Sequence, residues 1–138
     1  MGSFMTSLIG VTIDPVGYII PRPGSLPLFD PAVLEGYAAD DLVVRLVEMF
    51  SEDAPRRARE IVDGADVGLR ARAAHALRGC ALNLGATDLA RAAGAIETAM
   101  RAGDGARVNE LAQALEALTA STVQALRDYC SGMQRAPL

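Results

Sequence analysis

The sequence has few of the residues from which metal, redox and haem sites are built. Aromatic residues make up 4% of the 138 residues, tryptophan is absent, and histidine occurs once. Two cysteines, Cys80 and Cys130, lie far apart and outside any CxxC pair, so the usual zinc and dithiol spacings are missing. One histidine without an inward-facing Glu-x-x-His pattern leaves too few ligands for a haem or metal bundle.

Long apolar runs and excess positive charge are also missing. No apolar run reaches the roughly 20 residues that cross a membrane, and the N-terminus lacks the basic start of a secretory signal. The formal net charge of -4 disfavours a general nucleic-acid binder, which would be basic. A disulfide is disfavoured because the composition is typical of the cytoplasm. We therefore expect a cytoplasmic protein that binds neither membranes nor nucleic acid.

Apolar residues are abundant, at 51%, and alanine and leucine dominate them, which favours closely packed helices. The length suits one domain. Residues 1–29 differ from the rest because they hold four of the seven prolines. We interpret them as an extended or flexible leader, with a short hairpin packed on the bundle as the alternative. Residues 30–138 are predicted to form the helical domain.

Apolar residues at helical spacing predict the elements of that domain. A short helix starts at Asp30-Pro31 and ends at Gly36. The longer helices are expected at 40–64, 66–83, 87–102 and 106–129. Pro55 should kink or split the first of these near Ser51. The predicted fold is all-α: an antiparallel four-helix bundle with a short additional N-terminal helix and a non-helical leader.

The same spacing predicts which residues are buried. In the helix at 40–64 the expected apolar stripe is Leu42, Val43, Leu46, Val47 and Phe50. In the helix at 66–83 the expected buried side is Leu69, Ala73, Leu77, Cys80 or Ala81, and Leu84.

The single histidine, His75, lies in the helix at 66–83 but off its apolar side, so its imidazole is expected to point outward. The residues that share its face are Gly68, Ala71, Arg72, Arg78, Gly79 and Leu82. A neutral imidazole nitrogen is a good nucleophile at cellular pH, and arginines can hold phosphoryl oxygens. Small residues at 71 and 79 let a partner approach the helix closely. The alternatives are a plain solvated face and, for Gly79, close packing against a neighbouring helix.

The stretch AHALRGCALNLGA at 74–86 resembles the signature of the histidine phosphotransfer family, which reads His, any residue, Leu, Lys, Gly, small residues, Asn, Leu, Gly. The runs at 46–55, 96–97 and 101–104 also match, and the resemblance covers roughly 30–129. It implies that His75 is phosphorylated and that Arg78, in place of the usual lysine, stabilises the phosphoryl group. Gly79 would admit the partner, and Leu82, Ala71 and Arg72 would contribute to the docking surface.

The resemblance also implies partners and a mechanism. A receiver domain of a hybrid histidine kinase would donate a phosphoryl group to His75, and the receiver of a response regulator would accept it, in a bacterial-type relay. Mg²⁺ would come from the receiver, and the chain would bring no cofactor. No Gly-rich phosphate loop is present, so a carrier without ATP-dependent kinase activity is expected. We expect a monomer and a freestanding relay protein over an excised module. The alternative function is a helical adaptor that binds receivers without carrying phosphate.

Overall fold

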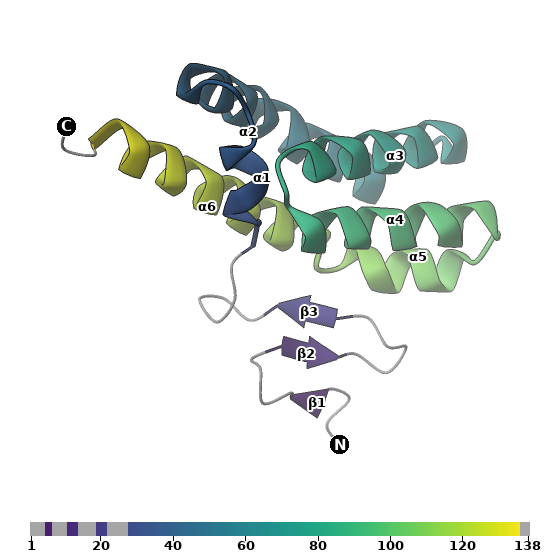
Figure 1. The fold of residues 1–138 in the computed structure, drawn as a ribbon. Helices are drawn as coiled ribbons and strands as arrows, with labels where there is room; N and C mark the ends of the chain where they lie inside the picture. The colour runs from purple at the N-terminus through teal and green to yellow at the C-terminus, as the bar shows by residue number, and fades with distance from the viewer. Residues whose placement is uncertain (1–4, 7–10, 14–18, 22–27, 136–138) are drawn as a thin grey trace.

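Six helices and three short strands make up the part of the chain that this computed structural model describes, residues 5–6, 11–13, 19–21 and 28–135 (Figure 1). The helices are α1 (Pro31–Glu35), α2 (Asp40–Asp63), α3 (Val67–Asn83), α4 (Thr87–Arg101), α5 (Gly105–Ala112) and α6 (Leu115–Arg135). α3 packs between α2 and α4, while α6 contacts α2 and α5 contacts α4. The predicted all-α bundle is confirmed.

The three strands are β1 (Met5–Thr6), β2 (Val11–Ile13) and β3 (Ile19–Pro21). They pair antiparallel in the order β1-β2-β3, with Val11 opposite Pro21 and Ile13 opposite Ile19. All three strands lie within residues 1–29, which the prolines led us to expect as extended or flexible. The rest of the predicted leader, apart from residues 28 and 29, lies outside the described residues.

Local signals in the sequence account for where three of the six helices begin and where two of them end. The carboxylates of Asp30, Asp66 and Asp104 accept hydrogen bonds from backbone N–H groups in the first turns of α1, α3 and α5. The turns after α3 and α4 contain Gly85 and Gly103, whose φ angles of 73° and 71° favour glycine. The first of these turns brings α3 and α4 side by side as a helical hairpin, and the second brings α5 onto α4 (Figure 1).

The segment before α2 is attached to the turn between α3 and α4. The Asp30 N–H donates to the Gly85 carbonyl at 2.9 Å, and the Tyr37 hydroxyl donates to the Asn83 carbonyl at 2.6 Å. The ring of Phe29 meets that of Tyr129 on α6 edge to face, with centroids 5.4 Å apart. α1 and its flanking residues therefore connect the α3–α4 turn to the rest of the bundle.

One predicted helix boundary is wrong, and one of two expected outcomes at Pro55 is excluded. Of the kink or split expected there, the split near Ser51 does not occur, because buried residues on both sides of the proline, Ala54 and Ala58 among them, hold α2 as one helix against the core. The expected single helix at 106–129 is instead α5 and α6, separated by residues 113–114. This break lets α5 pack on α4 and α6 pack on α2. The four-residue spacing of Leu111 and Leu115 continues across it, so the pattern hides the break.

The core is built from leucine, isoleucine and many alanines. Its fully buried large side chains include Leu34, Ile61, Leu77, Leu89, Ile96, Leu115 and Leu126. Two residues assigned to the core by spacing are exposed: Leu42 in the first turn of α2, and Leu69, which is 52% exposed. Leu69 lies about 80° from Leu77 around the axis of α3, beyond the edge of the buried arc. Leu42 likewise falls to one side of Val43 and Val47.

Candidate functional site

His75 lies on the exposed face of α3, and one of its ring nitrogens faces a buried carboxylate on α4. The side chain of His75 is 67% exposed. Its Nδ1 is 3.1 Å from Oε2 of Glu97, a residue that is only 6% exposed. The same oxygen accepts a hydrogen bond of 2.6 Å from Nη2 of Arg101, one turn further along α4. Glu97 therefore has two donors, one from each helix of the hairpin.

This arrangement selects one nitrogen of the ring. A carboxylate only accepts hydrogen bonds, so Nδ1 carries the proton that points at Glu97. In the neutral ring the lone pair then lies on Nε2, at the far side of an imidazole that projects into solvent. The result is an oriented imidazole whose accessible nitrogen is the nucleophilic one.

Two arginines on α3 flank the ring, as the sequence predicts. Arg72 and Arg78 are both exposed, and neither has a carboxylate partner in the described part of the chain. The stem of Arg78 leans on α4 at Gly94, where a Cβ would lie 3.2 Å from Cδ of the arginine. Both cations are thus available for an anion brought to His75.

The small and apolar residues predicted around His75 differ in how far they are exposed to solvent. Gly79 is exposed, and a Cβ added to it would meet no atom within 4 Å, so it does not serve packing against a neighbouring helix. Leu82 is 48% exposed on the same face. Ala71 is half-buried against the core and offers less surface than expected. The strip over Gly79 and Leu82 is open to a partner.

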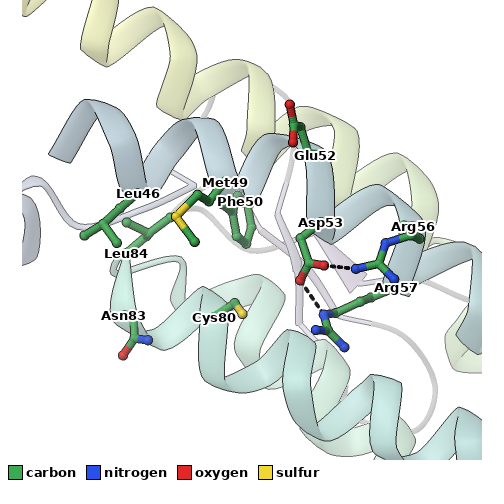
Figure 2. Close-up of a pocket in the computed structure, with 10 residues that line it drawn as sticks. All are labelled: Leu46, Met49, Phe50, Glu52, Asp53, Arg56, Arg57, Cys80, Asn83 and Leu84. Atoms are coloured by element: carbon green, nitrogen blue, oxygen red, sulfur yellow. Dashed lines mark hydrogen bonds and ion pairs between the residues drawn. The ribbon is translucent and has the colours of Figure 1, made fainter. Parts of the chain in front are cut away.

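A groove of about 590 Å³ lies between α2 and α3, on the side of α3 away from Glu97. Figure 2 shows Leu46 and Met49 on α2 beside Leu84, and Cys80 on the opposite wall. Met49 is 61% exposed, and Cys80 is a free, half-buried thiol next to Gly79 in the chain. The groove therefore continues the open strip across to α2.

Charged residues close one end of the groove. Asp53 forms ion pairs with both Arg56 and Arg57, and its carboxylate points between them in Figure 2. Partial burial alone would raise the pKa of Asp53, but hydrogen bonds and charge from Arg57 and Arg56 outweigh it and lower the pKa below its usual value. These two ion pairs hold charged side chains at one end of the groove, next to its apolar residues.

Sequence reasoning missed Glu97, Arg101 and the α2 half of this surface. Glu97 and Arg101 lie four residues apart, a spacing that signals an ion pair, but nothing local shows that the pair faces His75. Leu42, Leu46 and Met49 share a second face of α2, distinct from that of Val43 and Val47. That second apolar face is the signal that could have revealed the groove.

Among the described residues, no group of three or more His, Cys, Asp or Glu side chains is placed to hold a metal ion. Within the same residues, no helix is both long enough and apolar enough to span a bilayer.

The site and fold agree with a family comparison. The family model described as the Hpt domain matches residues 45–135, which is more than half of the chain and includes His75, Arg78, Gly79 and Glu97. Searches of curated proteins and of solved structures gave no match. The chain thus belongs to the Hpt family, whose domains act as histidine phosphotransfer carriers in phosphorelays, interact with receiver domains and are not kinases.

Proposed function

We propose that Nε2 of His75 is the atom that carries the phosphoryl group. The observation that supports this most directly is the contact between Nδ1 and the buried carboxylate of Glu97, at 3.1 Å. In the neutral imidazole, that contact puts the proton on Nδ1 and the lone pair on the outward Nε2. The donor would be a phosphoaspartate on the receiver domain of a hybrid histidine kinase, and the acceptor would be the aspartate of a response regulator.

The proposed transfer needs little chemistry from this chain. The Nε2 lone pair attacks phosphorus, and the bond between phosphorus and the aspartate oxygen breaks, returning its electron pair to the carboxylate. The ring gains positive charge in this step, and Glu97 stabilises it because the Nδ1 proton donates to a carboxylate. Attack by the second receiver's aspartate reverses these changes. Mg²⁺ bound by the receiver supplies charge neutralisation, so the chain brings no cofactor.

Arg78 is proposed to stabilise the phosphoryl group, since it is exposed and lies three residues from His75 on the same face. Receiver docking is assigned to Arg72, Gly79 and Leu82, with a smaller part for the half-buried Ala71. The groove between α2 and α3 extends this surface with exposed apolar residues, above all Met49. Exposed apolar residues that border a nucleophile favour a protein partner.

Replacement of His75 by glutamine tests the proposal. His75→Gln and the parent are each mixed with a ³²P-labelled receiver, and both label transfer and receiver affinity are measured. We expect unchanged affinity and complete loss of acid-labile, alkali-stable label, because His75 is the one histidine in the sequence. Label that persists on His75→Gln would refute the assignment. A parent that binds receivers but takes up no label would favour the adaptor function.

A further inference from the structure

Among the described glycines in long helices, Gly94 on α4 is the one whose added Cβ would meet a side chain from another helix, since at Gly68 it would meet only Asp66, the N-cap of its own helix. A Cβ placed on Gly94 would lie 3.2 Å from Cδ and 3.3 Å from Nε of Arg78, closer than the 3.4–4 Å of ordinary van der Waals contact. The same addition at Gly79 on α3 or Gly132 on α6 meets no atom within 4 Å. The stem of Arg78 therefore lies across α4 in the space that the missing side chain leaves.

Glycine in the middle of α4 has no other evident reason. It is the weakest helix former after proline, and its position three residues before Glu97 requires no turn. Gly94 has an ordinary negative φ, since the glycines with positive φ are Gly85 and Gly103 among the described residues. What the glycine provides is room for the arginine.

The position of this contact relates it to the phosphoryl site. His75 reaches α4 at Glu97, and Arg78, three residues along α3, reaches α4 at Gly94, three residues back. Both side chains therefore lean on the same helix, about one turn apart. Leaning on α4 restricts the long arginine stem, which would otherwise sample many rotamers in solvent.

We propose that Gly94 is a positioning residue: it accommodates the stem of Arg78 so that the guanidinium is held beside the imidazole of His75. The inference rests on the proposed function, in which Arg78 stabilises the phosphoryl group. The histidine phosphotransfer signature, which the sequence resembles, has lysine at the position of Arg78. Arginine has a planar Nε at the level of the close contact, so it needs flat, open space there.

The test is a double-mutant cycle with Gly94→Ala, Arg78→Ala and the double variant, measured by transfer rate and phosphohistidine lifetime. In the protein that retains Arg78, Gly94→Ala should reduce the transfer rate or the phosphohistidine lifetime by roughly two- to fivefold. This is the size expected for one exposed charge interaction. In the Arg78→Ala background it should change neither. The melting temperature of Gly94→Ala should equal or exceed that of the parent, since alanine is the better helix former.

Gly132→Ala is the matched control, because it makes the same exchange in a helix where the added methyl meets nothing. It should leave lifetime and rate unchanged. The proposal is overturned if Gly94→Ala lowers the melting temperature, or if its kinetic effect persists when Arg78 is alanine. It is also overturned if Arg78→Ala shortens the lifetime while Gly94→Ala does not.

A measurement without phosphate separates this inference from the proposed function. NMR relaxation of the Arg78 Nε–H should show faster motion in Gly94→Ala than in the parent, and no change in Gly132→Ala. Unchanged motion would overturn the contact itself, whatever the kinetics show. A parent protein that accepts no phosphoryl group would refute the proposed function, and the relaxation result would still decide whether Gly94 positions Arg78.

Discussion

The two sides of α3 meet their neighbouring helices in different ways. At the surface between α3 and α4 the contact is polar: His75 and Arg101 both meet one carboxylate oxygen of the buried Glu97. Toward α2 lies an open groove with apolar walls, where Met49 is 61% exposed. In the proposed function, the first side orients the reactive atom of His75, and the second offers surface to a partner. One helix thus separates chemistry from recognition, and variants on each side should affect different measurements.

The strip between the two sides should be the most sensitive to added bulk. Gly79→Gln places a side chain in open space that the receiver must enter, so we expect transfer to fall by roughly 100-fold, as for a misplaced reacting group. The melting temperature should stay the same or rise, since glutamine is the better helix former. Label transfer and thermal melting check this, and a large loss of stability would show that Gly79 packs against something.

On the α4 side, Glu97→Ala removes the hydrogen bond that orients the imidazole. Transfer should slow by about tenfold, because a hydrogen bond to a charged group contributes about 1.5 kcal/mol or more. Receiver affinity should hardly change. Glu110→Ala, an exposed carboxylate on α5, is the control for loss of charge. Equal affinity with slower transfer is expected only for Glu97, and equal rates for both variants would contradict its orienting role.

On the docking side, Leu82→Asp should weaken receiver affinity by roughly tenfold, because it puts a charge into an apolar contact. Leu69→Asp is a close control: it alters a leucine of similar exposure, 52% against 48%, on the same helix but away from the open strip. Titration of a labelled receiver checks both variants. Saturating receiver should restore the transfer rate of Leu82→Asp. Equal weakening by both would mean that the strip over Gly79 and Leu82 is not part of the docking surface.

At the charged border of the groove we expect the smallest effect, and one that depends on pH. The folded-state pKa of Asp53 lies below its usual value of 3.8, so its contribution to stability is present above that value and is lost as pH falls through the lower folded-state pKa. Asp53→Asn should therefore melt a few degrees below the parent at pH 7, since about 1 kcal/mol corresponds to a few degrees. The gap should narrow below about pH 4. A gap that is constant with pH would exclude an ionic origin.

Features that depend on neighbouring residues in the chain were predicted well. The start of α1 at Asp30 and the outward direction of His75 were predicted from short-range spacing, and the caps Asp66 and Asp104 and the turn glycine Gly85 are local signals of the same kind. Features that depend on how two helices are placed were not. The contact between His75 and Glu97 needs the register of α3 against α4, and spacing within one helix carries no information about it.

The exposed leucines illustrate a second limit. Leu42 and Leu69 fit the apolar pattern of their helices, yet both are exposed because each lies at the edge of the buried arc in the first turn of its helix. Apolar spacing shows which residues share one face of a helix, but it does not show how much of that face a neighbouring helix covers. The break between α5 and α6 was missed for a related reason, since the spacing of Leu111 and Leu115 persists across a change of direction.

The attachment of α1 to the α3–α4 turn has a consequence for where the functional unit begins. The family match starts at residue 45, whereas the Asp30 N–H and the Tyr37 hydroxyl hold the two carbonyls at Gly85 and Asn83. That turn joins the helices that bring His75 opposite Glu97. A fragment that begins at residue 45 would keep every residue of the site. It would lose the hydrogen bonds from Asp30 and Tyr37 to the turn between α3 and α4. We therefore expect the smallest fragment with the phosphotransfer activity of the whole chain to start ahead of Asp30.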